Sequence, residues 1–189
     1  MSPTSYAWEG IVGFLNRLRG TPPQPWPPPG PITSWPREPL KLTTEVTAVL
    51  LDPGRQTVDV VGEGSYQGTL ERVAGGRTEN GALNRDHFAL LLPEPSNPYD
   101  PNAVRVLIPT GGTVGYLSRE NAVAYRPAIE RVAAVGKLLG CRASLSGGWD
   151  RGSDDRGSFG VRLFLEDPDH VMAEIESDPD NLRPWGGGG

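Results

Sequence analysis

The residues best suited to chemistry stand in one short segment, Pro93 to Val106, which reads PEPSNPYDPNAVRV. Within four positions it offers the amide of Asn97, the aromatic ring of Tyr99 and the carboxylate of Asp100. The interleaved prolines fix the backbone, and a rigid backbone lowers the entropy cost of presenting such groups to a ligand. The alternative is that Asn97 and Asp100 only cap the turn through backbone hydrogen bonds, as these residue types often do. Spacing alone leaves both interpretations open.

The sequence indicates catalysis or metal binding less strongly than it indicates ligand binding by the Pro93–Val106 segment. The sequence has no GxxxxGK[ST] phosphate loop, so an ATPase is not predicted. Cys141 is the single cysteine and there are two histidines, which excludes an internal disulfide and a structural zinc cluster. Four acidic residues could hold a metal for phosphodiester cleavage, but nothing in the pattern places them together; they are Asp100, Asp154, Asp155 and Glu166. We therefore expect a binding protein without catalytic residues, cofactor or metal.

The elements that would position this segment are mostly short strands. Runs of apolar and β-branched residues bounded by Gly, Pro, Asn and Asp predict strands. These runs cover 43–51, 57–61, 87–92, 103–108, 113–117, 142–145 and 159–165. Helical spacing predicts a short helix over 66–73, capped by Ser65, and a second helix after the N-cap Ser118, with Pro127 placed to kink or divide it. The pattern predicts a mainly β (α+β) fold, a small closed or partly open barrel with two short helices.

The two ends of the chain differ in composition from the centre. Between residues 6 and 19, five apolar residues share one helical face: Trp8, Ile11, Val12, Leu15 and Leu18. This pattern favours a helix that docks on its own domain or on a partner over one that lies on a membrane. Dense proline then indicates an extended linker. We predict a helix and linker over 1–40, the folded domain over 41–168, and a flexible acidic and glycine-rich tail over 169–189.

The overall charge and the N-terminus restrict location and partners. The formal net charge of −5 argues against broad, charge-driven binding to duplex DNA, because phosphate neutralisation supplies most non-specific affinity. A local site that relies on stacking and a few hydrogen bonds remains compatible with this charge. The sequence shows neither a signal peptide pattern nor an apolar stretch that would span a bilayer. A cytoplasmic protein without membrane partners is expected.

Five groups of residues resemble the HIRAN family, a module found in fork-remodelling ATPases and in free-standing bacterial proteins. They are Val60 to Glu63 with Ser65 to Gln67, Pro93 to Val106, Val114 to Glu120, Cys141 to Ala143 with Gly147 and Gly148, and Phe159 to Val161. They occur in the family's order between about Lys41 and Asp167. NPYDPNAV followed by VGYLSRE is the most specific part of the match.

The resemblance implies an OB-like or SH3-like barrel and, by likeness to the best-studied animal member, a pocket for the 3′ end of single-stranded DNA. Asp100 would accept a hydrogen bond from the terminal 3′-hydroxyl, and Asn97 would bind the end nucleotide. Tyr99 and Tyr66 would pack on base or sugar, and Arg119 would meet a phosphate.

The remaining predicted site residues are Tyr116, which stands where that member has a pocket histidine, and Phe159, which would stack on a neighbouring base. Gly64 and Ser65 replace an Arg-Tyr pair, so a phosphate could instead lie on the amides of residues 64–66. Tyr66, Tyr116 and Phe159 also have a plain interpretation as barrel core. The loop from Trp149 to Arg156 either flanks the pocket or is a solvated turn.

We predict an accessory nucleic-acid-binding module that captures single-stranded DNA ends in repair, replication restart or defence, with a helicase or nuclease partner acting in trans. The alternative is a protein-interaction module that docks such a partner without contacting DNA. In that case the acidic balance would reflect the lack of nucleic-acid contact.

Overall fold

The structure is a computed structural model that describes residues 48–52, 54–109, 111–152 and 154–183. The predicted N-terminal helix and the proline-rich linker lie outside the described residues. The described strands are β1 (Ala48–Leu50), β2 (Thr57–Val61), β3 (Arg77–Thr78), β4 (Gly81–Ala82), β5 (Asp86–Pro93), β6 (Val104–Ile108), β7 (Gly112–Leu117), β8 (Leu138–Gly147) and β9 (Phe159–Phe164). The described helices are the 3-10 turn η2 (Glu63–Tyr66), α2 (Gln67–Val73), α3 (Arg119–Ala133) and α4 (Pro168–Ser177).

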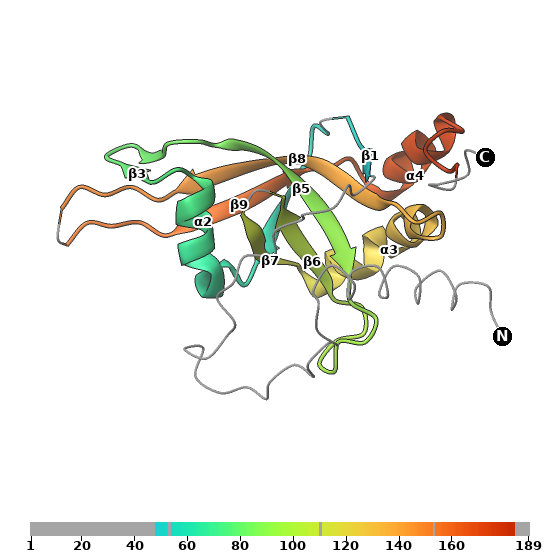
Figure 1. Ribbon diagram of the computed structural model, residues 1–189, viewed down its shortest axis with the longest axis horizontal. Coiled ribbons are helices and arrows are strands. Elements are labelled where there is room, and N and C mark those ends of the chain that lie inside the picture. The colour runs from blue at the N-terminus through green and yellow to red at the C-terminus, as the bar shows by residue number, and fades with distance from the viewer. Residues whose placement is uncertain (1–47, 53, 110, 153, 184–189) are drawn as a thin grey trace.

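Six strands close into a barrel, in the order β8-β5-β6-β7-β2-β9, because β9 also pairs with β8. All six pairings are antiparallel, and the short strand β1 adds to β8 in parallel. The ten-residue strand β8 makes this closure possible, since its residues 139–144 pair with β5 and its residues 142–147 pair with β9 (Figure 1). Its first residues, 138–140, also pair with β1. The prediction of a mainly β barrel is confirmed.

Alternation along the strands fills the barrel interior. On β6, Val104 and Val106 point inward, and on β9, Val161 and Leu163 do the same. At Gly115, φ is +154° and a Cβ atom would lie 2.6 Å from the carbonyl oxygen of Val61. Only glycine fits this close approach of β7 to β2.

The two predicted helices, α2 and α3, both pack on the core of the barrel. Helix α2 buries Leu70 and Val73, and α3 buries Ile129 and Val132, in the same core as the strands. Ser118 is the N-cap of α3, as predicted, and its Oγ accepts a hydrogen bond from the backbone N of Asn121 (3.1 Å). Ser65 does not cap α2, because residues 63–66 form a 3-10 turn and the helix begins only at Gln67. Helix α3 continues through Pro127.

A third helix, α4, replaces the first part of the tail that was expected to be flexible from residue 169. Asp167 caps its N-terminus, and Pro168 occupies its first turn, where a missing N–H does no harm. Val171 and Ile175, one turn apart, are fully buried in the main core. The expectation was wrong here because the burial of this apolar pair outweighs the acidic composition around it.

No helix within the described ranges is long and apolar enough to cross a membrane.

Candidate functional site

The loop from Pro93 to Ala103 is held in shape by its own polar side chains. Asn97 Oδ1 accepts hydrogen bonds from the backbone N of Tyr99 (3.0 Å) and of Asp100 (3.3 Å). Asp100 Oδ1 in turn accepts one from the backbone N of Asn102 (2.9 Å). The turn-capping interpretation of Asn97 and Asp100 is therefore what the structure shows, and any contact with a ligand would be an additional task for these two residues.

The loop and the first residue of α3 present side chains of different kinds at the surface. The Tyr99 side chain is about half exposed, at 49%. Next to it, Asp100 Oδ2 lies 3.2 Å from Arg119 Nε, the first residue of α3, and the Arg119 side chain is 80% exposed. The Asp100 carboxylate and the Arg119 guanidinium thus meet at the junction of the loop and α3, and the half-exposed Tyr99 directly precedes Asp100 in the loop. This part of the predicted site is assembled by the fold.

Glu94 joins this loop to the barrel wall. One of its carboxylate oxygens forms an ion pair with Arg105 of β6, and the other accepts a hydrogen bond from Asn97 Nδ2 (3.0 Å). The second oxygen also lies 3.4 Å from the hydroxyl of Tyr116 on β7. Both Glu94 and Arg105 are largely buried, at 15% and 12% side-chain exposure. Neither residue is among the site residues predicted from the sequence; the structure brings Arg105 opposite Tyr116 through the register of β6 and β7.

Tyr66 and Tyr116 form a half-buried aromatic pair beside Arg105. Their ring centroids are 6.5 Å apart and the planes are tilted by 48°. Burial raises the pKa of Tyr66, and it raises the pKa of Tyr116 to about 12, although the positive charge of Arg105 opposes both shifts. Both phenols therefore stay protonated at neutral pH and keep hydrogen bonds to donate. Through Glu94 this pair is connected to Asn97.

Phe159 belongs to the core and not to an open stacking surface. Its side chain is 2% exposed, and the guanidinium of Arg77 lies over its ring at 4.4 Å from the centroid. Gly148 approaches the ring so closely that a Cβ there would lie 1.9 Å from Phe159 Cε1. The predicted stacking of a base on Phe159 is thus not supported, because the ring has no free face.

One of the three amides at residues 64–66, considered from the sequence as an anion site, is already used within the turn. The backbone N of Ser65 already donates to the carbonyl oxygen of Gly62 (3.1 Å), which closes the 3-10 turn. The neighbouring Glu63 carboxylate accepts a hydrogen bond from the backbone N of Val161 (3.0 Å). A negative charge therefore stays next to this turn.

The hairpin loop after β8 is tied together by its own charged residues. Arg156 Nη2 lies 2.7 Å from Asp150 Oδ2, and Trp149 Nε1 donates to Asp155 Oδ1 (2.7 Å). A backbone hydrogen bond from Gly152 lowers the pKa of Asp150, and Arg156 adds to the effect. The solvated-turn interpretation accounts for these contacts. Among the described residues, no group of three or more His, Cys, Asp or Glu side chains could hold a metal ion.

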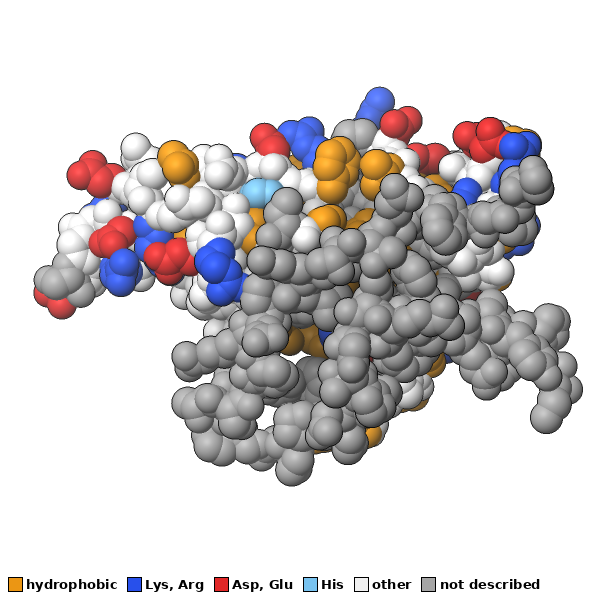
Figure 2. All heavy atoms as spheres, viewed as in Figure 1, with side chains coloured by type: hydrophobic (Ala, Val, Ile, Leu, Met, Phe, Trp, Pro, Cys, Tyr) orange, Lys and Arg blue, Asp and Glu red, His pale blue; other side chains and the backbone are white. Residues whose placement is uncertain are grey.

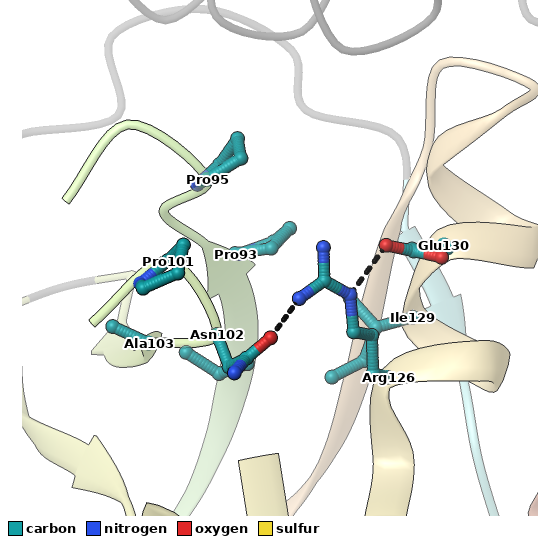
Figure 3. Close-up of a pocket in the computed structure, with 9 residues that line it drawn as sticks. Pro93, Pro95, Pro101, Asn102, Ala103, Arg126, Ile129 and Glu130 are labelled. Carbon is teal, nitrogen blue, oxygen red and sulfur yellow. Dashed lines mark hydrogen bonds and ion pairs between the residues drawn. The ribbon is translucent and has the colours of Figure 1, made fainter. Parts of the chain in front are cut away.

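A small pocket lies between the Pro93–Ala103 loop and α3 (Figure 3). Pro93, Pro95 and Pro101 line one side of it, and Arg126 and Ile129 of α3 line the other. Arg126 bridges the two sides by a hydrogen bond to Asn102 Oδ1, and it also donates to Glu130 Oε1 (2.6 Å) on its own helix. The described lining of this pocket includes none of the seven predicted site residues. The contact of Arg126 with Asn102 fixes the loop to α3.

The chain is similar to known proteins in part of its sequence. Residues 55–145 match the family model of the HIRAN domain. Three proteins named helicase-like transcription factor are similar: 45% identity over 58 residues in Oryctolagus cuniculus, 39% over 66 in Mus musculus and 39% over 72 in Homo sapiens. These matches cover 30% to 37% of this chain and only 6% to 7% of the relatives.

One solved structure is also similar, the crystal structure of the HIRAN domain of human HLTF. It shows 20% sequence identity and a TM-score of 0.34, over 68% of this chain and 86% of that chain.

Proposed function

This chain carries a HIRAN domain, and from that premise we propose that its barrel binds single-stranded DNA at a strand end. The binding surface consists of Asn97, Tyr99, Asp100 and Arg119, with the Tyr66 and Tyr116 pair behind them. The function is binding without catalysis. A helicase or nuclease that acts in trans on the captured end, in repair, replication restart or defence, belongs to the same proposal.

The observation that carries the proposal is the Asp100–Arg119 ion pair, with the half-exposed Tyr99 as the preceding residue, on a loop fixed by internal hydrogen bonds. A half-exposed ring can stack on a base, which is worth about 1–3 kcal/mol per base. The carboxylate can accept a hydrogen bond from a terminal hydroxyl, and the guanidinium can bind a phosphate. Because the loop is already rigid, little entropy is lost when it binds.

The charge of the chain agrees with recognition of an end and not of a long backbone. Arg119 supplies one exposed cation, while Arg105 lies deeper and is paired with Glu94. We expect a shallow dependence of affinity on salt, since each phosphate neutralised on a single strand changes the slope of log K against log [salt] by about −0.7. A slope of several units would indicate a different, strongly basic surface and would count against this site.

The decisive experiment is fluorescence anisotropy of the full chain with four labelled oligonucleotides of the same sequence. They carry a free 3′-hydroxyl, a 3′-phosphate, a blocked 3′ end with only the 5′ end accessible, or no end because the strand is circular. The proposal requires the 3′-hydroxyl strand to bind most tightly. Equal binding of the circular strand would refute capture of an end, and no binding of any strand would favour the protein-interaction alternative.

Tyr99 provides a matched pair of variants for this measurement. Tyr99→Ala removes the ring and should weaken binding by about 1–3 kcal/mol, which is roughly 5- to 150-fold, whereas Tyr99→Phe keeps the stacking surface and should lose much less. Since the ring is half exposed, the melting temperature should change little in either variant. Equal affinity of the alanine variant and the native protein would remove Tyr99 from the site.

A further inference from the structure

The barrel wall formed by β5, β6 and β8 is apolar on both of its faces. On β5, Ala89 and Leu91 belong to the main core, while Leu90 and Leu92 belong to a second, separate buried cluster with Leu107 and Leu138. Successive residues of a strand point to opposite faces of the sheet, so the second cluster lies on the outside of the barrel. The outer face of an antiparallel sheet is usually polar. This wall therefore differs from a sheet that faces only water.

Strand pairing aligns these outer residues into a continuous row. Leu50, Gly140, Leu90 and Leu107 stand opposite one another across β1, β8, β5 and β6. A Cβ atom on Gly140 would lie 2.6 Å from Leu50 Cδ2 and 3.1 Å from Leu90 Cδ2, so the two leucines close over the glycine. Phe88, two residues before Leu90 and on the same face, is 56% exposed, and Leu50 is 55% exposed.

We call the set of residues on this side of the sheet the outer apolar face. It consists of Ala48, Leu50, Phe88, Leu90, Leu92, Leu107 and Leu138. Figure 2 shows hydrophobic side chains gathered over this part of the sheet, where β1, β5 and β8 lie in Figure 1. Leu90, Leu92, Leu107 and Leu138 of this face are buried, while Leu50 and Phe88 are more than half exposed. An apolar cluster on the outside of a sheet, bordered by exposed apolar side chains, marks an interaction site.

The described helices use their apolar sides elsewhere. The buried residues of α2, α3 and α4, such as Leu70, Ile129 and Ile175, belong to the main core, except Ala133 at the end of α3, which is in neither cluster. Within the described part of the chain, the second cluster contains residues of strands only. The partner of the outer apolar face must therefore be sought outside these helices.

We propose that the outer apolar face is the docking surface for residues 6–19 of the same chain. That segment places Trp8, Ile11, Leu15 and Leu18 on one helical face. A helix of 14 residues is about 21 Å long, which suits a row of four strands spaced about 4.8 Å apart. The size and the apolar character of segment and surface match.

The place where the described chain begins supports this occupant over others. The chain enters the described region at Ala48, and Ala48 itself packs against the outer cluster. The 28 residues from 20 to 47 can extend up to about 90 Å, so the connection imposes no geometric limit. Because the segment is tethered, its effective concentration at this surface is in the millimolar range. A second copy of the chain would have to compete with it.

Hydrogen exchange of the full chain, read by mass spectrometry, tests the proposal with three single substitutions. In the native protein, the amides of residues 6–19 should be protected. Phe88→Asp places a charge on the outer apolar face, and Leu15→Asp places one on the segment; each should abolish that protection while the barrel still melts cooperatively. Leu83→Asp is the matched control, since Leu83 is equally exposed (63%) but lies outside the face. It should leave the protection of residues 6–19 unchanged.

Results of two kinds, from exchange and from self-association, would overturn the proposal. One is rapid exchange of residues 6–19 in the native protein, or protection that survives Phe88→Asp. The other is protection of the outer apolar face that increases with protein concentration together with a dimer in sedimentation velocity, which would assign this surface to a second copy. The inference does not depend on DNA binding, because the experiment contains no nucleic acid.

Discussion

The side chain of Gln67 makes two hydrogen bonds to the backbone of Phe159, 92 residues away in the chain. Its Oε1 accepts from Phe159 N (2.8 Å), and its Nε2 donates to Phe159 O (3.0 Å). Glu63 binds the backbone N of Val161 in the same way (3.0 Å). Strand β2 pairs with β9 only as far as Asp59 opposite Arg162, and these two side chains take over where that pairing stops. The segment between β2 and α2 is thereby fixed to the barrel, and with it Tyr66.

We predict that Gln67→Ala lowers the free energy of unfolding by about 1–3 kcal/mol. Both hydrogen bonds disappear, and two backbone groups that are partly buried lose their partners. Urea unfolding followed by circular dichroism measures the effect. Arg72→Ala on the same helix is the control and should stay within about 0.5 kcal/mol of the native protein, because Arg72 is exposed. Equal stabilities of the two variants would show that the hydrogen bonds between Gln67 and Phe159 contribute nothing to stability.

Cys141 is predicted to be inert in the folded protein. Its side chain is fully buried on β8, and burial raises the pKa of the thiol from 9.0 to about 12. Since the thiolate is the reactive form, the raised pKa leaves only a very small thiolate fraction at pH 8, and burial also blocks access of the reagent. Reaction with a chromogenic disulfide at pH 8 should be fast in urea and very slow in buffer. Rapid labelling of the native protein would mean that the barrel opens frequently at β8.

The N-terminus of α4 is predicted to make stability depend on pH. His170 Nδ1 lies 2.5 Å from Asp167 Oδ2, and this contact raises the pKa of His170 above its ordinary value of 6.5. The hydrogen bond from the backbone N of His170, followed by its side chain, lowers the pKa of Asp167 below 3.8. The histidine contribution is complete below pH 6.5 and is lost as pH rises through the raised pKa. The aspartate contribution is present above pH 3.8 and is lost as pH falls through the lowered pKa.

The pair is therefore strongest between about pH 4 and 6.5. The melting temperature of His170→Gln should fall below that of the native protein most clearly near pH 5.5, and the difference should shrink by pH 8.5. His87→Gln controls for the loss of a histidine, since the His87 ring meets the backbone oxygen of Asn84 (3.2 Å) and not a carboxylate. A difference that stays constant with pH would refute the ionic contact.

Where alternation or capping was clear, sequence predicted the fold well. The alternating run TVDVV is strand β2 with its predicted bounds, and Ser118 caps α3. The first half of β8 was missed because Leu138 to Cys141 is buried on both faces and does not alternate. The strands β3 and β4 have two residues each, too few to show a period.

The loop of the candidate site could be predicted from the sequence, whereas the contacts that join this loop to the barrel could not. The loop stood out because its prolines, Asn97 and Asp100 form a recognisable turn pattern. Glu94 did not, because a single glutamate before a turn carries no pattern, and its role arises from Arg105 and Tyr116 on two later strands. Phe159 could not be assigned to core or ligand until the Arg77 guanidinium was seen over its ring.

Substitutions of Asp100 can distinguish its role in the fold from its proposed role in DNA binding, because its two carboxylate oxygens have different partners. Oδ1 accepts the turn-closing hydrogen bond from Asn102 N (2.9 Å), and Oδ2 pairs with Arg119 Nε (3.2 Å). Asp100→Asn keeps an oxygen for the turn and removes the charge. Asp100→Ala removes both. We expect the alanine variant to lose about 0.5–1.5 kcal/mol of stability, and the asparagine variant to lose less, in urea unfolding.

DNA binding should respond to the charge and not to the turn. A carboxylate accepts a hydrogen bond from a 3′-hydroxyl and repels a 3′-phosphate, so the native protein should prefer the hydroxyl end. Asp100→Asn should bind that end more weakly by about 1.5–3 kcal/mol, the range for a hydrogen bond to a charged group, and should lose the preference. Anisotropy titrations with both ends measure this. If Asp100→Asn retains the native preference while Asp100→Ala only loses stability, Asp100 serves the turn alone and the terminal hydroxyl is read by another residue.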